Sequence, residues 1–435
     1  MSSKIPQYKK IKITELFISG GKLVLPGKKT INNPGIYITN GKISKGTPEG
    51  KKGVNILQLK DTEYIAPGFI DLHCHLREPG NPESETIERG SLSAVAGGFT
   101  EILCMPNTNP PLDNPKLVKQ VITKARRTEN ARVYVIASAT KNREGKVLSP
   151  VKSLIRAGAV ALSDDGAPIE DDRLMYKLLL LSKEYRLPII NHCEVRALSR
   201  NGTINDGKIS KKLGLKGIPD IAESIMVLRD LILQTHTGGI LHIAHVSTKK
   251  SVEVLRWAKA QGIRFTAETC PHYFTLTENY CAGLDPNYKV SPPLRTKADV
   301  EAIKEALADG IIEVIATDHA PWHRRYKQSG WQKARPGMIG LETAFSLGYE
   351  QLVLKKYLSL EKFIACLTQN PRRILARSLT LEAGDDALIT IFDLSIDWIY
   401  EKDLIFSRSS NTPFLGRSFK GKITKVIVNN YLFIF

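Results

Sequence analysis

Eight short apolar runs, separated by longer segments with helical periodicity, dominate the sequence between residues 64 and 318. The runs occupy residues 64–73, 99–105, 132–138, 158–163, 187–192, 240–246, 263–269 and 311–318. Apolar runs without strict alternation are typical of parallel strands that are covered on both faces. Eight such strands with intervening helices predict an α/β fold, a (β/α)8 TIM barrel. A doubly wound sheet is the alternative, but its glycine-rich phosphate turn is missing.

Two of the intervening segments show the helical pattern clearly. Residues 171–186 place apolar residues on one helical face, and residues 220–235 repeat this with Ile221, Ile225, Leu228 and Ile232. Asp220 and Glu223 predict a capping box at the start of the second helix.

The two ends of the chain have a different pattern. Residues 12–60, 387–393 and 422–434 alternate apolar and polar residues around Gly and Asn turns, which predicts hairpins. Because the ends of a domain usually lie close together, we expect residues 1–64 and 380–435 to form one small β-sandwich domain. The barrel domain then spans residues 65–379.

The formal net charge of +18 raises nucleic acid or an anionic membrane as partners. Residues 1–60, however, hold twelve lysines against Glu15 and Glu49, so more than half of the excess lies outside the predicted barrel. These lysines lack the interleaved aromatic residues that bind single strands. We interpret them as a solubility or association feature and expect neither a nucleic-acid nor a membrane partner.

Cysteine usage and hydropathy indicate the compartment. The six cysteines are scattered without a CxxC pair, which is typical of reduced thiols. The first residues contain no apolar stretch of the kind that a secretory signal has. The apolar runs are also far shorter than the roughly 20 residues of a membrane helix. We therefore expect a cytoplasmic protein.

Five of the eight runs end in metal-type ligands. They are His73 and His75, Asp164 and Asp165, His192, His245, and Asp318. The carboxyl ends of barrel strands meet at one mouth, and an H-x-H pair on an extended strand can offer two imidazoles to one ion. A single histidine at a strand end is more often structural, but the combined set predicts a metal site. Its carboxylates and imidazoles suit Zn2+, with Mn2+, Co2+ and Fe2+ as alternatives.

Such a site supports hydrolysis. A bound metal lowers the pKa of water toward neutrality and polarises a carbonyl group. Asp318, at the end of the eighth run, is the candidate general base and acid.

Motifs along most of the chain resemble those of one enzyme family. They are GFIDLHCHLREPG (68–80), MPNTNPP (105–111), LSDDG (162–166), INHCE (190–194), HVS (245–247), ETCPHY (268–273), PPLR (292–295), ATDHAP (316–321), GLETA (340–344) and NTPFLG (411–416). In this order they resemble the amidohydrolase superfamily and, more narrowly, class I dihydroorotases.

The resemblance implies a role for each matching residue. His73, His75 and Asp318 match ligands of a first metal, and His192 and His245 match ligands of a second. Asp165 matches the bridging carboxylate, with Asp164 as the neighbouring alternative. Arg77 and Asn107 match residues that hold a substrate carboxylate. One or two Zn2+ ions per subunit are implied.

Two positions depart from the family pattern. Trp322 stands where the family usually has a histidine that grips the substrate carboxylate, and His323 follows one residue later. Ser291 stands where an asparagine that contacts the pyrimidine ring is common. We count all three as candidate substrate-binding residues.

The implied reaction is the reversible ring closure of N-carbamoyl-L-aspartate to (S)-dihydroorotate, a step of pyrimidine synthesis. Trp322 motivates a first alternative, a related hydrolase acting on hydantoins, dihydropyrimidines or allantoin. A second alternative is a non-catalytic partner of aspartate transcarbamoylase. A homodimer and an association of the active enzyme with that transcarbamoylase both stay open.

Overall fold

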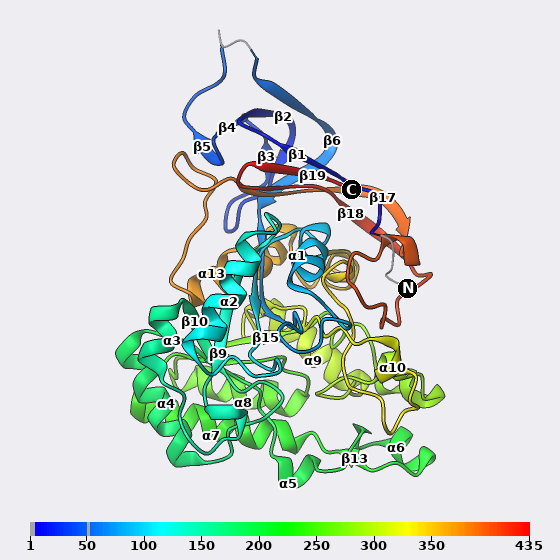
Figure 1. Ribbon diagram of the computed structural model, residues 1–435. Helices are drawn as coiled ribbons and strands as arrows, with labels where there is room; N and C mark the ends of the chain where they lie inside the picture. The colour runs from blue at the N-terminus through cyan, green and yellow to red at the C-terminus, as the bar shows by residue number, and fades with distance from the viewer. Residues whose placement is uncertain (1–4, 50–52) are drawn as a thin grey trace.

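The computed structural model describes residues 5–49 and 53–435. A barrel surrounded by helices lies on one side, and a β-rich unit that contains both ends of the chain lies on the other (Figure 1). The predicted fold class is confirmed.

Eight parallel strands form the barrel wall, each overlapping one of the predicted runs. They are β7 (Phe69–Cys74), β8 (Phe99–Cys104), β9 (Arg132–Ser138), β10 (Ala159–Ser163), β11 (Ile189–Asn191), β14 (Leu241–Ile243), β15 (Thr266–Thr269) and β16 (Val314–Ile315). The first and last strands meet through a parallel bridge between Cys74 and His319, where the His75 N–H donates to the His319 carbonyl at 2.9 Å. This contact closes the barrel at the end where β7 and β16 finish.

Helices follow most of these strands and cover the outside of the barrel (Figure 1). The longer ones are α1 (Ile87–Ala96), α2 (Pro115–Arg126), α3 (Val151–Ala157), α4 (Asp172–Tyr185), α7 (Ile221–Thr237), α8 (Lys249–Ala260), α9 (Lys297–Ala308) and α12 (Leu360–Leu367). Shorter ones are α5 (Arg196–Ser199), α6 (Lys208–Leu213), α10 (Arg324–Lys327), α11 (Ala344–Gly348) and α13 (Gln369–Ile374), with a two-stranded ribbon of β12 (Ile204–Asn205) and β13 (Gly217–Ile218).

Helix α7 exists as predicted, but the apolar face identified from the sequence is not the face that packs against the barrel. Ile221, Ile225 and Ile232 are 37%, 48% and 46% exposed, whereas Ala222, Met226, Val227 and Leu231 are buried. Because α7 is apolar on two faces, periodicity alone could not select the face that packs against the barrel.

The predicted capping box of α7 is also wrong. The Asp220 carboxylate accepts from the Ile221 N–H at 2.8 Å. Glu223 instead accepts from the Ser247 and Thr248 N–H groups, at 3.1 and 3.2 Å, just beyond β14. A tertiary contact with the barrel mouth therefore takes the carboxylate that the motif had assigned to the helix end.

The β-rich unit is one nine-stranded sheet built from both ends of the chain. Its strands are β1 (Lys9–Lys12), β2 (Glu15–Leu23), β3 (Ile31–Asn32), β4 (Ile36–Thr39), β5 (Lys42–Ser44), β6 (Asn55–Pro67), β17 (Leu388–Ile399), β18 (Ser418–Val428) and β19 (Tyr431–Ile434). The β4–β5 hairpin turns at Asn40-Gly41, both with positive φ, as this turn type requires. The division of the chain at residues 64/65 and 379/380 stays a prediction.

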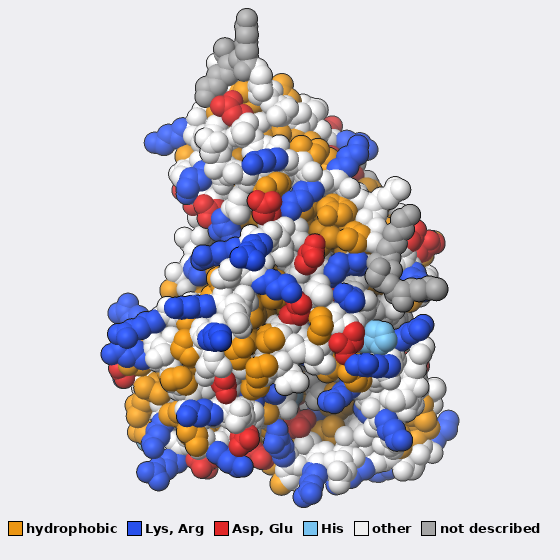
Figure 2. Space-filling view, in the orientation of Figure 1, with side chains coloured by type: hydrophobic (Ala, Val, Ile, Leu, Met, Phe, Trp, Pro, Cys, Tyr) orange, Lys and Arg blue, Asp and Glu red, His pale blue; other side chains and the backbone are white. Residues whose placement is uncertain are grey.

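Positive charge is spread over both units rather than gathered in one stripe on the visible face (Figure 2). Of the twelve lysines in residues 1–60, Lys4, Lys51 and Lys52 lie outside the described residues. Among the helices that are described, none combines the length and apolar character needed to cross a membrane.

Candidate metal centre and substrate pocket

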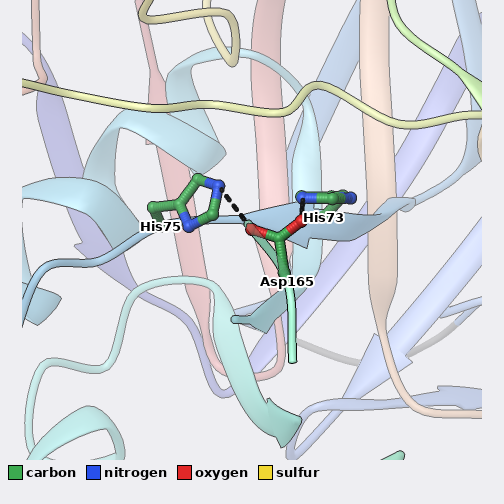
Figure 3. Close-up of side chains that lie close together, drawn as sticks. All are labelled: His73, His75 and Asp165. Carbon is green, nitrogen blue, oxygen red and sulfur yellow. Dashed lines mark ion pairs between the residues drawn. The ribbon is translucent and has the colours of Figure 1, made fainter. Parts of the chain in front are cut away.

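Six side chains from five strand ends meet at the mouth of the barrel. His73 lies in β7 and His75 just after it, and Asp165, His192, His245 and Asp318 lie one to three residues beyond β10, β11, β14 and β16. Figure 3 shows Asp165 between His73 and His75. The predicted convergence of these residues is therefore present in the fold.

Asp165 is the centre of this cluster. Its Oδ1 lies 3.4 Å from His73 Nε2, 3.5 Å from His245 Nε2 and 3.7 Å from His192 Nδ1, and its Oδ2 lies 3.7 Å from His75 Nε2. Burial raises the pKa of this carboxyl, but the charge of His73 and the close approach of the His245 and His73 rings outweigh burial and hold the pKa well below its usual range. Asp165 is thus held as a carboxylate facing four imidazoles.

Asp164 has different surroundings. Its Oδ1 accepts from the Ser138 hydroxyl at 2.8 Å and from the Thr140 N–H at 3.1 Å, and its Oδ2 accepts from the Thr140 hydroxyl. These bonds tie Asp164 to the end of β9, so Asp165 alone of the pair approaches the histidines.

Asp318 completes the cluster on the side of His75. Its Oδ1 lies 3.0 Å from His75 Nε2 and 3.6 Å from His73 Nε2. Burial raises its pKa, but the hydrogen bond from His75 and the charges of the nearby histidines bring the pKa down to about 2. The group is a carboxylate at neutral pH.

The donor set fits a divalent cation. Two overlapping groups have all their ligand atoms within 4.8 Å of one another: His73 with His75 and Asp165, and Asp165 with His192 and His245. The buried His73 Nε2 has no hydrogen-bond partner among the described residues, and His192 Nδ1 lies only 2.8 Å from His245 Nε2. Imidazole lone pairs converging on a shared carboxylate are what a borderline metal such as Zn2+ prefers.

Behind His73 lies a carboxylate that the sequence analysis missed. Glu268 Oε1 is 2.8 Å from His73 Nδ1, and its Oε2 is 3.2 Å from His242 Nε2. Burial raises the pKa of Glu268, but bonds to His242 and His73 lower it to about 2. A carboxylate at Nδ1 directs the Nε2 lone pair of His73 toward the cluster. The sequence signal that could have indicated this residue is its position near the end of the seventh apolar run.

Asp71 is a second missed residue. It accepts from the His73 N–H at 3.2 Å, the Thr317 N–H at 2.9 Å and the Thr317 hydroxyl at 2.6 Å. Burial raises its pKa to about 7 despite these bonds. Asp71 joins the strand that carries His73 to the residue that precedes Asp318.

Asn107 contacts the cluster directly. Its Oδ1 lies 2.8 Å from His75 Nδ1, and its Nδ2 donates to Asp165 Oδ2 at 3.1 Å. A residue predicted to bind substrate therefore also orients two candidate metal ligands.

Arg77 and Trp322 stack on each other. Arg77 is buried, has a φ of 57°, and its Nε donates to the Pro321 carbonyl at 3.1 Å. Burial lowers the pKa of Arg77 to about 10, so the guanidinium is still charged at neutral pH. Its Cζ lies 4.0 Å from the centroid of the Trp322 ring.

Ser291 and His323 are not joined to the cluster. The His323 ring caps α10, where its Nδ1 accepts from the Arg325 N–H at 3.4 Å. Within residues 5–49 and 53–435, the Ser291 hydroxyl has no hydrogen bond. His272, in the ETCPHY motif, is buried, and burial lowers its pKa to about 4.

Comparison with known proteins agrees with this geometry. A family model described as Dihydro-orotase-like matches residues 62–251. The chain is 46% identical over 396 residues to a dihydroorotase of Endomicrobium trichonymphae, covering 90% of this chain and 93% of the relative. It is 42% identical over 415 residues to a dihydroorotase of Acetivibrio thermocellus, covering 95% and 97%.

Solved structures with the same fold have lower identity. An L-hydantoinase (dihydropyrimidinase) from Arthrobacter aurescens superimposes with a TM-score of 0.85 at 22% identity, over 96% of this chain and 95% of that chain. A dihydropyrimidinase from Brevibacillus agri gives 0.80 at 21%, over 96% and 94%. At this identity the likeness concerns the fold alone.

Proposed function

The chain belongs to the dihydroorotase family, and from this premise we propose that it catalyses the reversible ring closure of N-carbamoyl-L-aspartate to (S)-dihydroorotate. The observation that carries the proposal is the position of Asp165 within 3.4–3.7 Å of four imidazoles, beside Asp318. In the closing direction the open-chain dianion takes up one proton and releases one water.

One or two Zn2+ ions would be held by His73, His75, Asp165, His192, His245 and Asp318. When bound, such a metal supplies water of lowered pKa and polarises the carbonyl that reacts. Asp165 would be shared between the two ligand groups, which supports a two-metal arrangement.

Asp318 is the group that we assign to proton transfer in the reaction. In the ring-opening direction its carboxylate accepts a proton from the attacking water and passes it to the departing amide nitrogen. The low pKa of this group supports the role, because the carboxylate must be unprotonated before it can accept.

Arg77 and Asn107 are proposed to bind the carboxylate that ring and open chain share. A guanidinium that is buried and still charged is suited to this task by its fork of donors. Trp322, His323 and Ser291 are kept as candidate substrate-binding residues.

We also propose a cytoplasmic location, which the six unpaired and buried cysteines support. A homodimer and an association with aspartate transcarbamoylase are kept as proposals.

Steady-state assays of the purified, zinc-supplemented protein test the function. We expect metal-dependent turnover of both dihydroorotate and N-carbamoyl-L-aspartate, and no more than traces with hydantoin, dihydrouracil or allantoin. Turnover of a neutral ring alone would favour the hydantoinase-type alternative. No turnover by a metal-loaded protein would favour the non-catalytic one.

A further inference from the structure

Arg143 is a second guanidinium beside the metal-type cluster, in a loop that has no role so far. It ends the short helix η1 (Lys141–Arg143), which follows β9. Its Nη2 donates to the main-chain carbonyl of Asp165. Its Nε is buried and has no hydrogen-bond partner among the described residues, although the side chain as a whole is partly exposed. The guanidinium therefore has N–H groups that can donate to a ligand.

The backbone of Arg143 has an uncommon conformation. Arg143 has a φ of 57°, in the left-handed region that non-glycine residues avoid. Three other residues of the site share this feature: Arg77 (57°), His245 (33°) and Asp318 (45°). Such positions cost of order 1–3 kcal/mol each and cluster at functional sites. Arg143 thus resembles the site residues in its backbone as well as its location.

Two side-chain donors, from Arg143 and Asn107, lie around the Cα of Gly166. A Cβ atom added to Gly166 would lie 3.6 Å from Arg143 Nη2 and 4.0 Å from Asn107 Nδ2. A ligand atom at this position would contact two donors, one of which belongs to a proposed substrate-binding residue. Glycine at residue 166 keeps the position free.

Both guanidinium groups lie near carboxylates of the cluster. Burial has the largest effect on the pKa of Arg77 and lowers it, the charges of Asp318 and Asp165 raise it, and the charges of Arg143 and Arg335 lower it. Two neighbouring guanidinium groups repel each other, and a carboxylate between them relieves the repulsion. Trp322, at the position where the family has a carboxylate-gripping histidine, donates its ring N–H to the Pro336 carbonyl instead, at 2.8 Å.

We propose that Arg143 binds the carboxylate of the substrate together with Arg77 and Asn107, and supplies the contact that Trp322 cannot make. The inference rests on the proposed function and deepens it, because it adds a specificity-determining residue for carboxylated rings.

Kinetics of Arg143→Gln, with Lys141→Gln as control, test the proposal. Lys141 is an exposed residue of the same loop and loses the same charge. We expect KM for dihydroorotate and N-carbamoyl-L-aspartate to rise at least tenfold in Arg143→Gln, with kcat within threefold and zinc content unchanged. The control should keep both constants. A fall in kcat together with loss of zinc would overturn the proposal, because Arg143 would then only support Asp165. An unchanged KM would overturn it as well.

A second variant and a binding measurement test the role of Arg143 independently of turnover. Gly166→Asn tolerates a positive φ but places a side chain beside the Arg143 and Asn107 donors, so KM should rise while Arg143 is intact. An unchanged KM would argue that no ligand atom lies there. Calorimetric titration with N-carbamoyl-L-aspartate separates this inference from the proposed function. If wild type binds without turnover and Arg143→Gln binds at least tenfold more weakly, the proposed function fails and the role of Arg143 stands. If both bind equally or neither binds, the role of Arg143 is wrong.

Discussion

The indole ring of Trp322 lies over the guanidinium of Arg77, with 4.0 Å between the Arg77 Cζ and the ring centroid. Two hydrogen bonds hold Trp322 in place. Its main-chain N–H donates to Asn411 Oδ1 at 3.0 Å, and its indole N–H donates to the Pro336 carbonyl. Asn411 lies between β17 and β18, so the terminal part of the chain helps to set the position of a barrel-mouth arginine. The departure from the family pattern at residue 322 thus creates a stacking wall for Arg77.

Removal of this wall should weaken substrate binding more than catalysis. A cation–π contact in a desolvated place contributes about 1–2 kcal/mol, so Trp322→Ala should raise KM for dihydroorotate roughly 5- to 30-fold. Trp322→Phe, which keeps a ring, should lie between wild type and Trp322→Ala. Trp257→Ala, at an exposed tryptophan of α8, is the control. An unchanged KM in Trp322→Ala would mean that Arg77 needs no stacking partner.

The two neighbouring aspartates should behave in opposite ways when each is changed to asparagine. Asp165→Asn should lose most of its zinc, measured per chain after dialysis, because the carboxylate shared by four imidazoles is gone. Asp164→Asn should keep its zinc and instead lose about 1–3 kcal/mol of unfolding free energy, since an amide cannot accept all the bonds from Ser138 and Thr140. Loss of zinc in Asp164→Asn alone would reverse the assignment.

Glu268→Gln should weaken metal binding without removing a ligand. A partner that orients a ligating histidine is typically worth 10- to 100-fold in metal affinity, and the amide can present either a donor or an acceptor to His73 Nδ1. Competition with a zinc chelator measures the change. Glu253→Gln, on the exposed side of α8, is the matched control and should leave the affinity unchanged.

The buried ion pair between Glu101 and Arg372 predicts an acid-dependent loss of stability. Both side chains are buried, and Arg372 Nε donates to Glu101 Oε2 at 2.9 Å. Burial raises the pKa of Glu101, but the charge and hydrogen bonds of Arg372 and the hydroxyl of Tyr134 lower it below its usual value. The folded pKa therefore lies below the unfolded one, so this stabilisation is complete above about pH 4.3 and is lost as pH falls through the folded pKa.

Arg372→Met should remove that stabilisation at neutral pH. It leaves a buried carboxylate without its main partner, which costs about 3 kcal/mol, the lower end of the usual range. Arg377 Nη1, 4.0 Å from Glu101 Oε1, compensates in part. Urea unfolding at pH 7 measures the loss, and a Glu101→Gln/Arg372→Met double variant should recover part of it. If the double variant were no more stable than Arg372→Met, the carboxylate would not be the cause.

The sequence by itself determined the barrel and the candidate ligands. Eight apolar runs specify eight buried strands, because a parallel sheet covered on both faces tolerates little else. Ligand-type residues at the ends of five runs had to converge, since all strands of a barrel finish at the same mouth.

Only the tertiary structure decided which groups face which. Asp164 and Asp165 are the same residue type side by side, and the hydroxyls of Ser138 and Thr140 select the one that turns away. Glu223 fits a capping motif, yet the N–H groups beyond β14 take its carboxylate. Glu268, Asn107 and Arg143 gain their contacts from residues 195, 32 and 22 positions away along the chain. Such pairings depend on distances across the barrel, and a one-dimensional pattern contains no measure of those distances.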